Sequence, residues 1–193
     1  MSLLPEFELG LWNAWILVIP MVIILFFENR VVRARESRVE KKGLEYLTKK
    51  ERRTLNAMLF TMFASFVYAV FLPLQLGTAW FFPGLIIYLF GFFFTTTAIL
   101  NFASTPKNEL VTKGLYRISR NPMNIGWLMT QIGMSVACIS WLYLMLTVVL
   151  MILINATTPS EQRWCLETYG DPYREYMSRT PKWIGIPKSE KRG

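Results

Sequence analysis

Two polar segments, 111–126 and 159–184, hold the residues whose types and spacing could do chemistry. In the first, Arg120 is followed by Asn121, a residue type that caps helices, and by Pro122, which suits the first turn of a helix. A helix N-terminus with free N–H groups beside an arginine binds anions such as a carboxylate or a phosphate. The segment predicts an anion site here. The alternative is an ordinary helix start, with Arg120 reaching a lipid phosphate.

The second segment supplies the opposite charge. Pro159 and Ser160 predict the start of a helix, with Glu161 and Gln162 in its first turn. The Glu161 carboxylate could pair with a cation, or it could only complement the dipole of its own helix. Arg120 and Glu161 are forty-one positions apart, so they can meet only if the chain between them folds back on itself.

Tyrosines follow the carboxylate at regular spacing. Gly170 predicts the end of one helix, and Tyr173, Tyr176 and Arg179 recur every three residues on a second helix. The two tyrosines share a helix face, which could pack in the core or line the site. An anion site, a carboxylate and several aromatic rings together suit a zwitterionic ligand with a flat ring.

Several kinds of chemistry are disfavoured. The chain has no His and only two Cys, so a zinc or haem site is not expected and no metal ligands are predicted. The glycine-rich, Walker, nucleophile-elbow and zinc-protease motifs are missing from the sequence. Any reaction must therefore use Arg, Glu, Asn, Gln, Tyr and backbone groups.

The elements that must position these residues are membrane helices. The chain is 53% hydrophobic, which is too apolar for an ordinary soluble domain of 193 residues. Five apolar runs approach the ~20 residues that cross a bilayer, and backbone groups in lipid must be bonded within a helix. The runs cover residues 11–27, 57–76, 80–100, 123–139 and 141–156.

The basic residues predict how these helices are oriented. All 21 Lys and Arg fall in the connections after the first and third runs or after the fifth run. By the positive-inside rule, the fold class is an all-α polytopic membrane protein with about five transmembrane helices. Its N-terminus is expected outside, and its C-terminus, with short C-terminal helices, in the cytoplasm.

The connection 29–56 is the most basic part of the chain. It is expected to hold the topology and to attract anionic membrane lipids, and it lacks the interleaved aromatic residues of a nucleic-acid binder. Thr48 and Glu51 predict a capping box that starts the second membrane helix.

The whole chain, 1–193, is expected to form one membrane domain. Residues 11–110 would supply helices one to three with the basic loop, and residues 111–193 the cofactor-binding catalytic region. Within the fourth run, Gly133 and Ala137 share a face that allows a close helix approach. The nearby polar residue Gln131 and the threonines 95–97 could serve helix packing or line an intramembrane cavity.

The two polar segments carry a family resemblance. The order G-L-Y-R-x-x-R-N-P-M-x-x-G, two apolar runs, and then E-x7-Y-G-x2-Y-x2-Y-x4-P-x-W-I resembles the integral-membrane methyltransferase superfamily. That superfamily includes isoprenylcysteine carboxyl methyltransferases and phospholipid N-methyltransferases. The resemblance covers about the last 85 residues of the chain, whereas the first three runs match only in number and order.

The resemblance implies S-adenosylmethionine as the methyl donor and a lipophilic acceptor, either a lipid amine or a prenyl carboxylate or thiol. It implies an active site at the cytoplasmic face of the cell membrane, with Arg120 and Glu161 in the catalytic roles. The cofactor-binding residues that it implies are Gly114, Leu115, Tyr116, Arg120, Asn121, Pro122, Met123, Glu161, Gln162, Tyr173 and Tyr176.

The chain departs from the superfamily pattern at two of these positions and at a third position close to them. Asn121 replaces a His, as in the Asn-Pro-Met form of the phospholipid enzymes, and Asn124 stands where a Tyr is expected. Gln162 replaces the second acid of a Glu-Glu pair. Two other functions remain open: a nicotinamide-dependent membrane reductase of the sterol-reductase type, and a non-catalytic lipid-binding membrane protein. The oligomeric state is not predicted.

Overall fold

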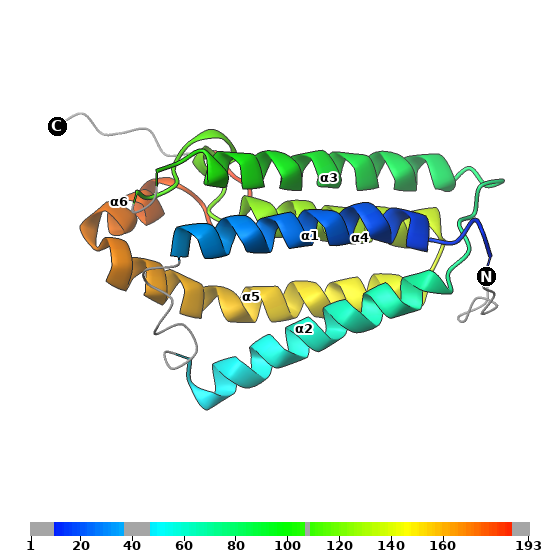
Figure 1. Ribbon diagram of the computed structural model, residues 1–193, viewed down its shortest axis with the longest axis horizontal. Helices are drawn as coiled ribbons and strands as arrows, with labels where there is room; N and C mark the ends of the chain where they lie inside the picture. Colours follow the sequence, from blue (N-terminus) through cyan, green and yellow to red (C-terminus); the bar gives the residue numbers. More distant parts are fainter. Residues whose placement is uncertain (1–9, 37–46, 107–108, 187–193) are drawn as a thin grey trace.

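The computed structural model describes residues 10–36, 47–106 and 109–186, and this part of the chain is helical with no strand (Figure 1). The prediction of an all-α fold is confirmed. The elements in order are α1 (Trp15–Glu36), α2 (Lys49–Val70), α3 (Phe81–Ala103), the short 3-10 helix η2 (Gly114–Arg117), α4 (Pro122–Ala137), α5 (Trp141–Tyr169) and α6 (Asp171–Arg179).

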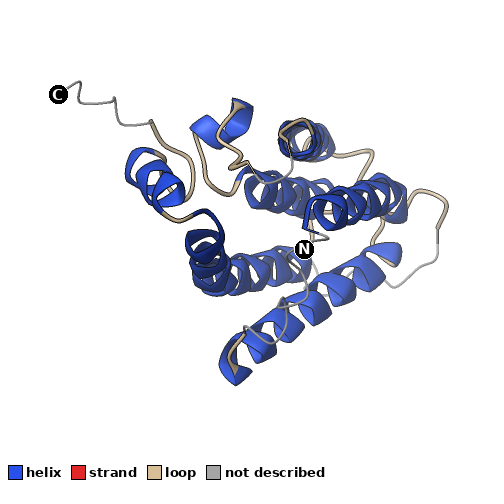
Figure 2. Cartoon of the chain, turned by 60° about the vertical axis from the view of Figure 1, so that its left-hand side comes forward, coloured by secondary structure: helices blue, strands red, loops and turns tan. Residues whose placement is uncertain are grey.

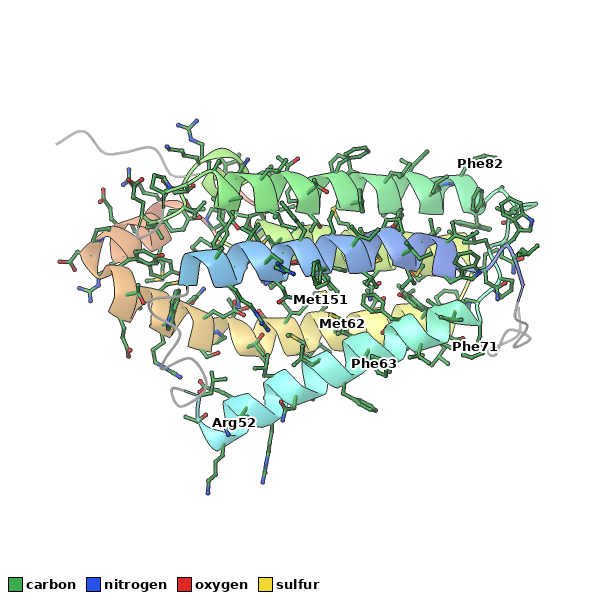
Figure 3. All side chains as sticks on the ribbon, viewed as in Figure 1. Arg52, Met62, Phe63, Phe71, Phe82 and Met151 are labelled. Atoms are coloured by element: carbon green, nitrogen blue, oxygen red, sulfur yellow. The ribbon has the colours of Figure 1, made fainter. Side chains whose placement is uncertain are left out.

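Four of these helices are long and apolar enough to cross a membrane: α1 over its residues 15–34, and the whole of α2, α3 and α5. Large apolar side chains such as Phe63 on α2 and Phe82 on α3 point outward, as expected where lipid replaces water (Figure 3). The chain is thus built as an integral membrane protein. Helix α4 has 16 residues, or about 24 Å, which is shorter than the ~30 Å hydrocarbon core. The count of five crossings and their orientation remain predictions.

The connection between α1 and α2 is only partly visible. Helix α1 continues to Glu36, so the first part of the basic connector is helical, and residues 37–46 lie outside the described part of the chain. The predicted capping box is confirmed at the other end. The backbone N–H of Thr48 donates to Glu51 Oε2 at 2.9 Å, and the backbone N–H of Glu51 donates to Thr48 Oγ1 at 3.2 Å.

Helices α3 and α4 pack closely because glycines face backbone across the interface. A Cβ on Gly133 would lie 2.6 Å from the Cα of Tyr88, and one on Gly84 would lie 2.7 Å from the Cα of Ala137. Real Cβ atoms do not approach other atoms so closely, so these positions accept only glycine at this helix separation. The predicted close approach at Gly133 and Ala137 is confirmed.

The polar residues inside the bundle serve packing. Gln131 is buried and accepts a hydrogen bond from the hydroxyl of Tyr143 at 2.8 Å, which links α4 to α5. The Thr95 hydroxyl donates to the carbonyl of Gly91 in its own helix at 3.0 Å. Of the two interpretations that the sequence left open, these bonds favour helix packing over a polar cavity.

Helix α5 corrects one prediction. No helix starts at Pro159 and Ser160, because α5 runs unbroken through them. Pro159 lacks the N–H that would bond the carbonyl of Asn155. Lys182 Nζ, from the segment after α6, lies 3.4 Å from that carbonyl oxygen instead. With 29 residues at about 1.5 Å each, α5 is about 44 Å long, so its last two turns extend past a ~30 Å core.

The two ends of the bundle differ. The buried hydrophobic cluster lies where α1 and α3 begin and α2 and α4 end, and it includes Met21, Leu72, Tyr88, Met134 and Tyr143. At the opposite end α2 diverges from α5, and η2, α6 and the last turns of α3 and α5 gather there (Figures 1 and 2). Arg163 on α5 reaches across to the diverging end of α2, where its Nη2 donates to both carboxylate oxygens of Glu51, at 2.9 and 3.0 Å.

Candidate functional site

The start of α4 differs from the prediction in one detail. Pro122 is the first helical residue and Asn121 is the N-cap residue, as predicted, but the Asn121 side chain does not cap the helix. Its Nδ2 donates to the carbonyl of Lys182 at 2.9 Å instead. The first N–H groups of α4 therefore have no side-chain acceptor from their cap residue, and this end of the helix keeps its capacity to bind an anion.

The loop before α4 is held from two sides. Gly114 has a φ of +58°, and the backbone N–H of Leu115 donates to Asn101 Oδ1 on α3 at 2.9 Å. The carbonyl of the buried Tyr116 accepts a hydrogen bond of 2.7 Å from the hydroxyl of Tyr176 on α6. In this structure Leu115, Tyr116 and Tyr176 thus hold the loop in shape with bonds to protein.

The segment 180–186 after α6, called here the C-terminal segment, runs against the residues that precede α4. The backbone N–H of Arg120 donates to the carbonyl of Pro181 at 3.0 Å. The backbone N–H of Gly185 donates to the carbonyl of Ile118 at 3.2 Å. These bonds cross sixty residues of sequence, so the C-terminal segment fixes where Arg120 stands.

Tyr173 joins Arg120 to α5. Its buried hydroxyl is hydrogen-bonded to the Arg120 guanidinium and to Cys165 of α5. Burial raises the pKa of Tyr173 to about 12, and the positive charge of Arg120 opposes the rise. Cys165 is one turn from both Glu161 and Gln162, so this contact brings Arg120 to the part of α5 that carries the predicted carboxylate.

Arg120 and Glu161 share an electrostatic environment centred on Lys182. Burial and then the charge of Arg120 lower the pKa of Lys182, whereas the charge of Glu161 acts to raise it. Both predicted residues are thus within range of one ammonium group, at one end of the bundle. Glu161 as a whole residue keeps an exposed surface there. The predicted meeting of the two polar segments occurs in the structure.

Two buried donors are left without a partner among the residues that the structure describes. They are Nε of Arg120 and Nε2 of Gln162, which come from the two different polar segments. A buried donor that bonds nothing costs about 1–3 kcal/mol, and native proteins rarely leave one unpaired without a reason. An acceptor with several lone pairs, such as a carboxylate, would satisfy both.

The other predicted residues are close to these but show no comparable feature. Pro122 is buried, and Met123 and Asn124 are half-buried in the first turn of α4. Within the described ranges, no three His, Cys, Asp or Glu side chains gather as metal ligands would.

Sequence reasoning missed Lys182, although the residue lies inside a quoted motif. It stands at the variable position of P-x-W-I, and nothing in the spacing indicates that its ammonium group would reach α5. The signal that could have found it is Pro159, because a proline inside a helix frees a carbonyl one turn earlier for an outside donor.

The comparisons with known proteins agree with this geometry. The family model for phospholipid methyltransferases matches residues 74–172, slightly more than half of the chain. The match runs from just before α3 into α6, and it includes Arg120, Glu161 and Gln162 but ends before the C-terminal segment. Searches of the curated proteins and of the solved structures found no match.

Proposed function

Because the chain belongs to the phospholipid methyltransferase family, we propose that it transfers a methyl group from S-adenosylmethionine to a lipophilic acceptor at the cytoplasmic face of the membrane. Membership makes it a membrane methyltransferase. The cofactor, the acceptor and the face are the parts that we propose.

One observation carries the choice of cofactor. The unpaired donors of Arg120 and Gln162 lie in the two segments that meet beside Glu161. A zwitterionic amino-acid group suits this set, with its carboxylate on Arg120 and Gln162 and its ammonium on Glu161. The methionine part of S-adenosylmethionine is such a group, so the residues present fit the cofactor.

Bound S-adenosylmethionine would supply an electrophilic methyl group on a sulfonium. The protein's own task is to orient the reactants and to exclude water, which in-line displacement needs more than acid–base help. Arg120, Gln162 and Glu161 would hold the amino-acid end. Gln162 is neutral, so one carboxylate balances the positive charges where the superfamily pattern has two.

We propose a phospholipid amine as the preferred acceptor, since the matched family is that of phospholipid methyltransferases. A prenyl carboxylate or thiol is the alternative acceptor. An amine must lose a proton to react, and a chain without histidine leaves Glu161, a tyrosine or the lipid phosphate to take it. The acceptor would reach the site from the bilayer, which surrounds the outward-facing apolar side chains.

The positions of the basic residues support the proposed cytoplasmic location. The site lies at the bundle end that carries Arg117, Arg120, Arg163 and Lys182, and positive charge marks the cytoplasmic side of a membrane protein. Membrane lipids are the expected partners, and no nucleic acid is expected.

Isothermal titration of the detergent-purified protein with S-adenosylhomocysteine, the demethylated product, tests the proposal. We expect binding by the wild type and a loss of more than tenfold for Arg120→Ala and for Glu161→Ala, taking ~1.5–3 kcal/mol for a charge-assisted bond. Arg174→Ala is the matched control, because Arg174 is 75% exposed and pairs only weakly with Asp171 at 3.5 Å.

A folded wild-type protein that does not bind this ligand would defeat the proposal. Binding of a nicotinamide nucleotide that S-adenosylhomocysteine does not displace would favour the membrane reductase. Absence of binding for both ligands would favour the non-catalytic lipid-binding protein.

A further inference from the structure

The ammonium group of Lys182 has a defined position, because the backbone that carries it is fixed. The Lys182 carbonyl accepts hydrogen bonds from Asn121 Nδ2 at 2.9 Å and from Ser119 Oγ at 3.4 Å. The residue before it accepts from the backbone N–H of Arg120 at 3.0 Å. Lys182 is therefore attached to the start of α4 through its backbone while its side chain extends to α5.

The side chain is anchored on α5 at the place where Pro159 interrupts the helix bonds. Pro159 has no N–H for the carbonyl of Asn155, one turn earlier. Lys182 Nζ lies 3.4 Å from that carbonyl oxygen and 2.6 Å from Asn155 Oδ1. An ammonium has three N–H donors, and Asn155 takes at most two of them. One donor remains for another acceptor.

The charges around this group are unbalanced. Lys182 and Arg120 are both positive and interact, and among the residues that the structure describes Glu161 is the only carboxylate that acts on Lys182. The second acid of the superfamily pattern is the neutral Gln162 in this chain. Two cations facing one carboxylate leave one positive charge in excess, which an anionic ligand group would balance.

We propose that Lys182 is a further cofactor-binding residue, an inference that rests on the proposed function. Together with Arg120 it holds the carboxylate at the amino-acid end of S-adenosylmethionine. The C-terminal segment thus supplies part of the site. The carbonyl freed by Pro159 keeps the ammonium within reach, so the helix interruption has a role in binding.

The test compares two ligands that differ in one group. S-adenosylhomocysteine carries the carboxylate, and its decarboxylated form keeps the adenosine, the sulfur and the ammonium. For Lys182→Gln we expect affinity for the first ligand to fall about tenfold or more in isothermal titration, and affinity for the second to change less than twofold. Lys182→Arg keeps the charge and is expected to stay within about threefold of the wild type for both. Lys113→Gln, an equal charge change at an exposed position, is expected to change neither.

Unchanged affinity of Lys182→Gln for S-adenosylhomocysteine would overturn the inference and leave the proposed function standing. An equal loss for both ligands would also overturn it, because that is the result of a structural role. If Lys182→Gln does not fold, Asn155→Leu replaces it, since this change removes the 2.6 Å side-chain contact of the ammonium and keeps every charge. We expect that variant to lose affinity only for the ligand with a carboxylate, and an equal loss for both ligands would again refute the role. A wild type that binds neither ligand would defeat the proposed function itself.

Discussion

Gly114→Ala is expected to damage the loop that positions Arg120 by two separate mechanisms. Gly114 has a φ of +58°, a conformation that costs a residue with a Cβ about 1–2 kcal/mol. The new Cβ would also overlap Oδ1 of Asn101, which now accepts the backbone N–H of Leu115 at 2.9 Å. Moving Asn101 away loses that bond, at about 0.5–1.5 kcal/mol. The sum is about 1.5–3.5 kcal/mol.

Thermal unfolding in detergent measures this cost, with two other glycines as controls. At about 2–4 °C per kcal/mol for a chain of this size, the midpoint should fall by roughly 3–14 °C. Gly170→Ala meets a positive φ of 60° but nothing within 4 Å, and Gly77→Ala meets neither problem. The expected order of destabilisation is Gly114, then Gly170, then Gly77.

A double variant separates the two mechanisms. Asn101→Ala removes the atom that the new Cβ would overlap, so Gly114→Ala should cost less in that background than in the wild type. An equal loss of stability in both backgrounds would show that the overlap with Asn101 does not destabilise the variant. A midpoint for Gly114→Ala as high as that of Gly77→Ala would refute the whole argument.

Two further variants test single hydrogen bonds, and a third tests a pKa. Trp127→Phe removes the ring N–H of α4 that donates to Glu28 of α1 at 3.0 Å. Thermal unfolding should show that the variant loses about 1–3 kcal/mol of stability. The loss should be smaller in a Glu28→Leu background, where the acceptor is already gone. Tyr143→Phe leaves Gln131 without its 2.8 Å bond and should cost about 0.6–1.7 kcal/mol by the same measurement; no change would mean that water or lipid replaces the bond. The third prediction concerns pH. The folded pKa of Tyr173 is raised to about 12 from an ordinary 10, so its contribution to stability is present below pH 10 and is lost as the pH rises to about 12. The unfolding midpoint of Tyr173→Phe should therefore fall less steeply over that range than the wild type's, and parallel curves would contradict the assignment.

The helices could be predicted because lipid leaves the backbone few choices. A long apolar run must satisfy its own N–H and C=O groups, so the runs 80–100 and 123–139 predicted α3 and α4 to within a few residues. The helix cap at the start of α2 could also be predicted from the sequence. The Thr48 and Glu51 pair forms its capping box with atoms only three residues apart, and needs nothing from the rest of the fold.

The parts of the site that depend on distant contacts could not be predicted. Asn121 has the side chain of a helix cap, but the carbonyl of Lys182, sixty-one residues away, accepts from it instead. Pro159 reads locally as a helix start, yet α5 continues through it. One reason that α5 can continue is that the Lys182 ammonium lies beside the Asn155 carbonyl that Pro159 leaves without a partner in the helix. No local sequence pattern predicts that contact.

The position of the site follows from how the two ends of the bundle are built. The glycine contacts of Gly84 and Gly133 hold α3 and α4 together near the end that carries the buried hydrophobic cluster, where α4 turns back into α5. From that turn the 16 residues of α4 and the first 15 residues of α5 cover almost the same rise, so Asn121 and Asn155 come level at the far end. Lys182 bonds both of them, one through its carbonyl and one through its ammonium. Because the packed end sets this register, residues that touch no ligand determine whether the arginine of one segment and the carboxylate of the other can face the same molecule.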